Sequence, residues 1–242
     1  MDNTSLIANS RPGPVYDPFL PIGHRLSKFP QAGVVTRQSQ RARRSRILAA
    51  IRRLLTESGC GSVTVRRIAT QSGYAVQTIY NLVGPRDQAI SEAISEYSLF
   101  VGRTARPRDE DPTAVLGIVS SWLNAIRSQP EFCRQTNLIF FTASRSIYYK
   151  FRDRQLRGMR NFLKRQQDCG VIRPSVNTRE LGEQLVLLSS ALWIEWSDRP
   201  FSLELLYDKL CSGCAGLLAD KCEPQHRPVI SDWLDAAVNR KG

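Results

Sequence analysis

The chain alternates between stretches with a 3.6-residue hydrophobic period and short polar breaks. The first periodic stretch starts near Thr36. Its apolar residues are separated by intervals of one, three or four residues, which places them on one face of a helix. These residues are Ile47, Leu48, Ile51, Leu54 and Leu55. Gly59 follows them and is typical of a helix C-terminus. The pattern therefore predicts a first helix that ends near Gly59 and buries one apolar face.

Two shorter helices are expected next, joined by a glycine turn. Thr64 is suited to cap a helix with the sequence VRRIATQS. Arg67 stands where a capping box needs a glutamate, so we expect a single capping bond. Ser72 and Gly73 form the turn. A third helix then runs from residue 74 to about residue 82.

A fourth helix is expected after Gly84, with Pro85 at its first position. It extends to about Arg103 and turns Ile90, Ile94 and Tyr97 inward, and a polar linker covers residues 103–112. The same periodicity predicts further helices over residues 112–128, 130–143, 146–168, 178–197, 201–219 and 228–239. No stretch alternates like a strand, so the predicted fold class is all-α: an N-terminal three-helix domain followed by a larger C-terminal helical bundle.

The expected domain limits follow from these breaks. Residues 1–36 hold five prolines and few periodic apolar positions, which predicts a disordered N-terminal tail. The three-helix domain then covers residues 37–84, and the C-terminal domain covers residues 85–242.

Positive charge is concentrated near the first three helices. The chain has 34 basic and 22 acidic residues and a net charge of +12. Residues 37–87 contain ten arginines and two acidic residues, so they carry +8 of that charge. A merely solubilising surface mixes both signs. The segregated charge instead indicates a polyanionic partner.

The chain lacks the sequence features of a membrane or exported protein. Its apolar stretches fall short of the roughly 20 residues that a span needs. The N-terminus has no basic segment followed by an apolar core, so we expect no signal peptide. We therefore expect a cytoplasmic protein whose six cysteines are reduced thiols.

Residues 64–83, TVRRIATQSGYAVQTIYNLV, have the spacing of a helix-turn-helix. Ala69 lets the two helices approach closely, and Gly73 adopts the positive φ that the turn needs. Ile68 and Ile79 pack inward and fix the angle between the helices. Together with the arginine-rich helix before it, this spacing predicts a domain that binds double-stranded DNA. The alternative is a three-helix domain with a purely structural role.

Residues 45–94 resemble the TetR family of bacterial transcriptional regulators, over about one fifth of the 242 residues. The residues that carry the resemblance are Thr64, Ile68, Ala69, Gly73, Thr78, Ile79 and Tyr80, with Arg86 where the family has a lysine.

The resemblance implies two groups of DNA contacts around these helices. Thr64, Tyr80 and Asn81 contact phosphates, and Arg86 binds another phosphate at a helix start. Three arginines form a flexible arm that enters the minor groove, namely Arg41, Arg43 and Arg44.

The resemblance also assigns base reading to the third helix. Val76, Gln77 and Thr78 face base edges in the major groove. Glutamine pairs bidentately with adenine, and the methyl groups of valine or threonine touch the methyl group of thymine.

Three residues depart from the family pattern. Ala75 replaces a serine, so the recognition helix loses a side-chain cap worth about 1 kcal/mol. Leu82 replaces a histidine and removes one phosphate contact. Val83 replaces a phenylalanine and loosens the packing against the fourth helix. These changes bear on the strength of operator binding and not on the fold.

Two helices of the C-terminal domain are apolar on more than one flank, and a helix of that kind buries both flanks. The positions concerned are Leu181, Leu185, Leu188, Leu192 and Trp196, with Val186 and Trp193 beside them, and Leu203, Leu206, Leu210, Cys214 and Leu217. The resemblance implies that this pair forms a homodimer interface, so that two domains meet a palindrome with half-sites about 34–36 Å apart. The alternative is an intramolecular core.

Two further clusters in the C-terminal domain suggest ligand chemistry. An effector pocket without buried charge would select an apolar or aromatic ligand, and its candidate residues are Trp122, Phe140, Phe141, Tyr148, Tyr149 and Trp193. The alternative is that these aromatics are core. The spacing of Cys211, Cys214, Cys222 and His226 resembles a zinc site. We favour small side chains at a helix seam, because two of the cysteines lie in an apolar helix, and we expect no metal and no cofactor.

The sequence thus predicts a ligand-responsive transcriptional repressor that is associated with the nucleoid and binds a palindromic operator as a dimer. A DNA-binding dimer without a small effector, regulated by a protein partner, is the alternative. An enzyme is disfavoured because the two histidines, His24 and His226, lie near the ends of the chain and no nucleophile or phosphate-loop motif is present.

Overall fold

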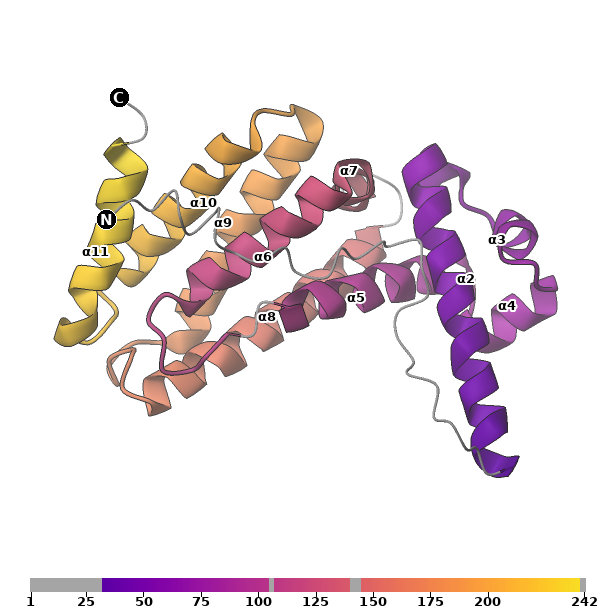
Figure 1. Cartoon of the computed structure of the whole chain (residues 1–242), viewed down its shortest axis with the longest axis horizontal. Coiled ribbons are helices and arrows are strands. Elements are labelled where there is room, and N and C mark those ends of the chain that lie inside the picture. The colour runs from indigo at the N-terminus through magenta and orange to yellow at the C-terminus, as the bar shows by residue number, and fades with distance from the viewer. Residues whose placement is uncertain (1–31, 105–106, 140–144, 240–242) are drawn as a thin grey trace. The chain divides into compact units, whose positions relative to one another are not determined.

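The computed structural model describes residues 32–104, 107–139 and 145–239 of the chain (Figure 1). Within these ranges the regular elements are helices, and the one β-type pairing is an isolated bridge between Ile172 and Cys222. The predicted all-α fold class is confirmed. None of the helices in these ranges is long and apolar enough to cross a membrane.

The helices follow the predicted order closely. They are α2 (Ala32–Ser62), α3 (Val65–Ser72), α4 (Val76–Val83), α5 (Arg86–Thr104), α6 (Ala114–Ser128), α7 (Pro130–Leu138), α8 (Arg145–Asp168), α9 (Thr178–Asp198), α10 (Leu203–Leu218), the 3₁₀ helix η2 (Pro224–His226) and α11 (Arg227–Asn239).

Several predicted helix ends differ from the structure, most of them by one or two residues. Pro85 lies one residue before α5 rather than at its first position. The helix expected over residues 130–143 is described only as far as Leu138, and residues 140–144 lie outside the described ranges.

The first helix is longer than the sequence pattern predicts at both ends. α2 starts at Ala32, so residues 32–36 are helical although we expected them in the tail. The rest of the expected tail, residues 1–31, lies outside the described residues. Pro30 is the last proline before Pro85, and the arginines, alanines and leucines after it are strong helix formers. At its other end the helix breaks at Gly59 (φ 69°, ψ 169°) and resumes as far as Ser62.

The chain forms two compact units. Among the described residues, the N-terminal unit comprises residues 32–100, 129–139 and 145–151, and the C-terminal unit comprises residues 101–104, 107–128 and 152–239. The N-terminal unit therefore contains most of α5 and all of α7, in addition to the three helices that we placed in residues 37–84.

The N-terminal unit is built around α2, which contacts α3, α4 and α7. The predicted apolar face of α2 is buried, as are the inward residues predicted for α5: Ile47, Leu48, Ile51, Leu54 and Leu55, and Ile90, Ile94 and Tyr97. The ring of Tyr97 packs edge-on against Phe132 of α7, with their centroids 4.8 Å apart. This core holds α3 and α4 against one side of α2.

The C-terminal unit is organised around α10, which contacts α6, α9 and α11. Leu206, Leu210 and Leu218 are among the buried residues of α10. The segment after α8 pairs with the segment after α10: the Arg173 N–H donates to the carbonyl of Lys221 (3.0 Å), and the Glu223 N–H donates to the carbonyl of Val171 (2.9 Å).

Candidate nucleic-acid interface

The turn between α3 and α4 is made by a glycine in the left-handed region. Gly73 has φ 73° and ψ 22°, and its N–H donates to the carbonyl of Ala69 (3.0 Å). Ile68 and Ile79 are both fully buried and face the core from the two helices. A side chain larger than hydrogen is strained at this φ, so the glycine fixes where α4 begins. The predicted helix-turn-helix geometry is therefore present.

The start of α3 is capped by one side-chain bond. The N–H of Arg67 donates to Thr64 Oγ1 (3.2 Å), and Thr64 has the extended backbone of an N-cap residue. The predicted single cap is confirmed. Because the hydroxyl oxygen is the acceptor in this bond, the O–H hydrogen of this exposed residue is still available as a donor.

One face of α4 is turned to solvent and carries no charge. Val76 and Tyr80 are 39% and 47% exposed, and Gln77 and Asn81 beside them are also exposed, while Thr78 is half-buried. On this face the Gln77 amide Nε2 donates to Asn81 Oδ1 (3.1 Å). The face is thus a strip of hydrogen-bonding and apolar groups, which is the chemistry of base-edge contacts.

The ends of α4 reflect two of the departures from the family pattern. Ala75 has the extended backbone of an N-cap but provides no side-chain bond, as expected from its methyl group. Val83 is buried at the other end, before Gly84 (φ 82°).

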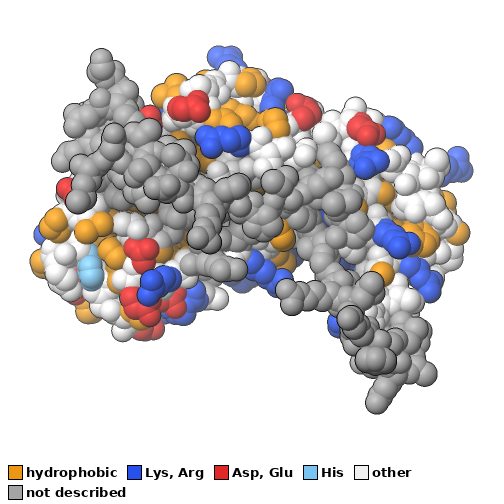
Figure 2. Space-filling view, in the orientation of Figure 1, with side chains coloured by type: hydrophobic (Ala, Val, Ile, Leu, Met, Phe, Trp, Pro, Cys, Tyr) orange, Lys and Arg blue, Asp and Glu red, His pale blue; other side chains and the backbone are white. Residues whose placement is uncertain are grey.

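Exposed basic side chains lie on the two helices that pack against α4. Figure 2 shows Lys and Arg side chains over the region of α2, α3 and α4. The exposed arginines of these helices are Arg41, Arg43, Arg46, Arg53, Arg66 and Arg67. Of these, Arg67 also stabilises the α2–α3 junction, because its guanidinium donates to the carbonyl of Ser62 (3.1 Å) and to Ser58 Oγ (2.9 Å). Most of the arginines that the sequence places on α2 and α3 are therefore exposed to solvent.

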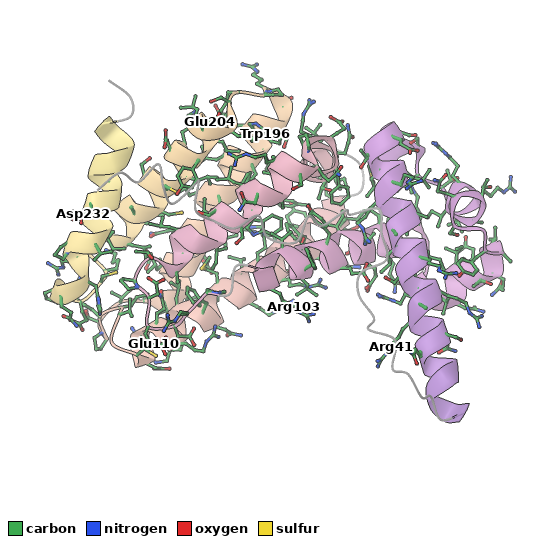
Figure 3. All side chains as sticks on the ribbon, in the orientation of Figure 1. Arg41, Arg103, Glu110, Trp196, Glu204 and Asp232 are labelled. Atoms are coloured by element: carbon green, nitrogen blue, oxygen red, sulfur yellow. The ribbon has the colours of Figure 1, made fainter. Side chains whose placement is uncertain are left out.

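The three arginines expected in a flexible arm lie instead within α2. Arg41 projects from the N-terminal part of that helix (Figure 3), and Arg43 donates to Ser39 Oγ one turn earlier (3.2 Å). Arg44 forms an ion pair with Glu92 of α5. The expected arm was wrong because the chain after Pro30 is rich in helix-forming residues, and the helix continues through these arginines.

Arg86 also lies differently from the expectation. Its guanidinium donates to the carbonyls of Cys60 (2.5 Å) and Val63 (2.6 Å) and pairs with Asp87 (2.5 Å). These bonds cap the end of α2 and hold the segment that leads into Thr64. The guanidinium thus binds groups of the protein itself. Its position at a helix start had instead predicted a phosphate contact.

The sequence of this domain matches a known family model. Residues 47–81 match the model described as bacterial regulatory proteins, TetR family. This range contains most of the apolar face of α2, the whole of α3 and the outward face of α4. The chain therefore carries the N-terminal domain of a TetR-family regulator.

Solved structures resemble the regulator over most of its length. SmeT, the repressor of the SmeDEF multidrug efflux pump of Stenotrophomonas maltophilia, is 15% identical, with 76% of this chain and 92% of SmeT covered and a TM-score of 0.57. A SmeT–triclosan complex is 18% identical, with 76% and 94% covered and a TM-score of 0.56.

Two regulators from other bacteria resemble the regulator to a similar degree. FadR of Thermus thermophilus, a repressor in complex with lauroyl-CoA, is 16% identical, with 73% and 93% covered and a TM-score of 0.54. TylP of Streptomyces fradiae is 16% identical, with 84% and 94% covered and a TM-score of 0.57. At these identities the likeness is one of fold. No curated protein sequence matches the chain.

The residues expected to line an effector pocket fall into three groups. Trp122 of α6 and Trp193 of α9 are half-buried in the C-terminal unit of the regulator. Tyr148 belongs to the N-terminal unit, where its ring lies edge-on to Tyr149 at 5.7 Å. Phe140 and Phe141 lie outside the described residues.

The cysteines with zinc-like spacing lie in the packing of the C-terminal unit. Cys211 and Cys214 are buried on α10, and Cys222 is buried at the bridge to Ile172. Burial raises the pKa of Cys214 to about 12, against a smaller opposing effect of the hydrogen bond with Ser189. No cluster of three or more metal-ligating side chains occurs in the described ranges.

Proposed function

We propose that this regulator is a ligand-responsive repressor that binds a palindromic operator as a homodimer. The observation that carries the proposal is the outward, uncharged face of α4, a helix that packs against α2 and α3, which carry the exposed arginines. A helix of this size fits the major groove of B-DNA, and guanidinium groups beside it neutralise phosphates. Such a protein acts on the chromosome, so the proposal includes a cytoplasmic, nucleoid-associated location and no enzymatic activity.

The proposed DNA contacts follow from the exposure of each residue. Thr64 donates its hydroxyl hydrogen to a phosphate while its oxygen keeps the cap, and Tyr80 reaches a phosphate with its own hydroxyl. Val76, Gln77 and Thr78 face base edges. The exposed arginines of α2 and α3 contribute phosphate contacts, and these include Arg41 and Arg43.

For two residues we propose a supporting role in place of a phosphate contact. Arg44 holds α2 against α5 through Glu92. Arg86 holds the end of α2, and with it Thr64, through the carbonyls of Cys60 and Val63.

The proposed dimer uses α9 and α10. Leu187 is 48% exposed and Leu205 is 38% exposed, although both are leucines. Further apolar side chains of the two helices are half-exposed in the single chain: Leu188, Leu192, Trp193, Ile194, Leu203 and Leu217. By contrast, Leu181, Leu185 and Trp196 are buried within the chain, with the Trp196 Nε1–H donating to the carbonyl of Phe201 (3.0 Å) (Figure 3). A second copy of the chain packed against α9 and α10 would remove the exposed and half-exposed apolar side chains from water.

The proposed effector is a small apolar or aromatic molecule. The lauroyl-CoA complex of FadR and the triclosan complex of SmeT support this chemistry, because lauroyl and triclosan are largely apolar groups. A panel of lipophilic compounds should raise the melting temperature of the purified regulator if one member binds the folded state. If no compound of the panel raises the melting temperature or alters operator binding, regulation by a protein partner would be favoured.

A binding-site selection with the full-length protein at low salt tests the DNA-binding proposal. We expect one palindromic sequence to be enriched. Tyr80→Phe should weaken binding to all duplexes alike, because it removes a phosphate contact, and Gln77→Ala should relax the preference for one base pair. Tyr149→Phe is a matched control, since Tyr149 is 49% exposed and lies on α8. If the wild-type protein binds no DNA duplex at low salt, the proposal is contradicted.

A further inference from the structure

The hydrogen bond between Gln77 and Asn81 is a specific feature of the outward face of α4. These residues are four positions apart, so their side chains lie one above the other on the helix. The bond joins Gln77 Nε2 as donor to Asn81 Oδ1 as acceptor over 3.1 Å, and both side chains are exposed. An exposed glutamine is otherwise free to rotate about three side-chain bonds, and this contact restricts it.

The bond leaves the base-reading edge of the Gln77 amide available. The amide nitrogen carries two hydrogens, and one of them is used by Asn81. Pairing with adenine requires that the hydrogen donated to Asn81 be the one trans to Oε1, so that the second hydrogen and Oε1 share one edge of the amide. That edge donates to N7 and accepts from N6 of adenine, which is the pairing that glutamine makes in the major groove.

The composition of α4 narrows what this helix can read. Its sequence, VQTIYNLV, contains no arginine or lysine, which are the side chains that pair bidentately with guanine. It also contains no aspartate or glutamate to accept a hydrogen bond from cytosine. Besides Tyr80 and Asn81, whose amide is also of the type that pairs with adenine, the exposed groups are the amide of Gln77 for adenine and the methyl groups of Val76 for thymine. The chemistry of the helix is therefore directed at A·T pairs.

We propose that Asn81 is a positioning residue, which holds Gln77 in the orientation that reads adenine, and that α4 thereby selects an A·T pair in each operator half-site. This inference rests on the proposed function. Asn81 acts through the Gln77 amide, and Val76 contributes contact with the methyl group of a thymine beside it.

A double-mutant cycle in a binding-site selection tests this role. The full-length proteins are wild type, Gln77→Ala, Asn81→Leu and the double variant, with helicity checked by circular dichroism. We expect wild type to enrich an A·T pair that Gln77→Ala reduces about tenfold. Asn81→Leu, which lacks an acceptor, should reduce that preference about two- to tenfold, because Gln77 is no longer held. When Gln77 is already replaced by alanine, Asn81→Leu should leave the base preference unchanged.

A conservative variant separates positioning from direct phosphate contact. Asn81→Asp keeps an oxygen acceptor for Gln77 but adds a negative charge close to the DNA. It should retain the preference for A·T while lowering the affinity for all sequences. If Asn81 bound a phosphate and did not act through Gln77, Asn81→Leu would lower the affinity for every sequence equally and would do so in both backgrounds.

The outcomes distinguish this inference from the proposed function. An enriched A·T pair whose selection is unchanged by Asn81→Leu overturns the positioning role. An enriched G·C pair at the position that depends on Gln77 overturns the adenine assignment. A wild-type protein that enriches no sequence overturns sequence-specific DNA binding itself.

Discussion

The guanidinium of Arg52 is fully buried in the N-terminal unit, where it lies 2.6 Å from the carboxylate of Glu96. Arg52 belongs to α2 and Glu96 to α5, and the same guanidinium nitrogen lies 3.5 Å from the carbonyl of Ala93. The pair joins the helix that supports the helix-turn-helix to the helix that follows it. A charge removed from water in this way needs its partner, and this has a direct consequence for stability.

Glu96→Ala should destabilise the regulator by about 3 kcal/mol, because it removes the carboxylate that pairs with the buried guanidinium. The control is Glu92→Ala, which breaks the neighbouring pair with Arg44. Both side chains of that pair are 38% exposed. Solvent screening therefore limits its cost to about 1 kcal/mol or less. Urea denaturation followed by circular dichroism measures both, and equal losses for the two variants would contradict the importance of burial.

Gly73→Ala should destabilise the helix-turn-helix by about 1–2 kcal/mol, since an L-residue is strained at its φ of 73°. No atom lies within 4 Å of a Cβ built at this position, so the strain belongs to the backbone alone. Gly61→Ala is the matched control, because that site is equally open and its φ is not positive. It should be neutral or stabilising by about 0.4–1 kcal/mol. Thermal unfolding of both variants decides whether the glycine turn has the geometry described.

Arg86→Met should lower the melting temperature and weaken DNA binding without changing its salt dependence. The variant removes the guanidinium that donates to the carbonyls of Cys60 and Val63, so the segment before Thr64 loses this support. A side chain that contacted a phosphate would instead reduce the slope of log K against log salt by about 0.9. Fluorescence anisotropy with one operator duplex at several salt concentrations gives the slope. A reduced slope would instead support the phosphate contact of Arg86 that the sequence suggested.

Two buried thiols should make the regulator less stable at alkaline pH. Burial raises the pKa of Cys133 and of Cys214 to about 12, from an ordinary value of 9.0. The unfolded chain therefore releases these protons at a lower pH than the folded chain, and stability decreases as the pH rises from about 9 towards 12. A variant with Cys133→Ala and Cys214→Ala should lose less stability between about pH 8 and pH 10.5.

A control and a labelling experiment complete this test. Cys169 is exposed, so Cys169→Ala should leave the pH dependence as it is in the wild type. At neutral pH a maleimide should modify Cys169 first, because the other five cysteines are buried. Rapid modification of Cys133 in the folded protein would contradict its burial.

The helix-turn-helix could be predicted residue by residue because its determinants are local. A threonine cap, a glycine that adopts positive φ, and isoleucines spaced for one helix face act within a few residues of one another, and the structure contains each of them. The exposure of Val76, Gln77, Tyr80 and Asn81 follows from the same period, since the buried Ile79 fixes the opposite side of α4.

The arginines show where local reasoning ends. Arg52 lies four residues after Leu48 and three before Leu55, so the helical period already places it on the buried face of α2. Its charge nevertheless led us to count it among the arginines that indicate a polyanionic partner. The sequence by itself thus determined the elements, the turn and the outward face of α4, because these depend on backbone preferences and periodicity.

Only the tertiary structure decided which arginines remain available to DNA. Arg44, Arg52 and Arg86 are bound to groups that lie 23 to 48 residues away along the chain. No local pattern encodes those partners, because they meet only when α5 packs on α2. The physical reason is that a guanidinium is satisfied equally well by a phosphate, a carboxylate or a backbone carbonyl, and packing determines which of them it reaches.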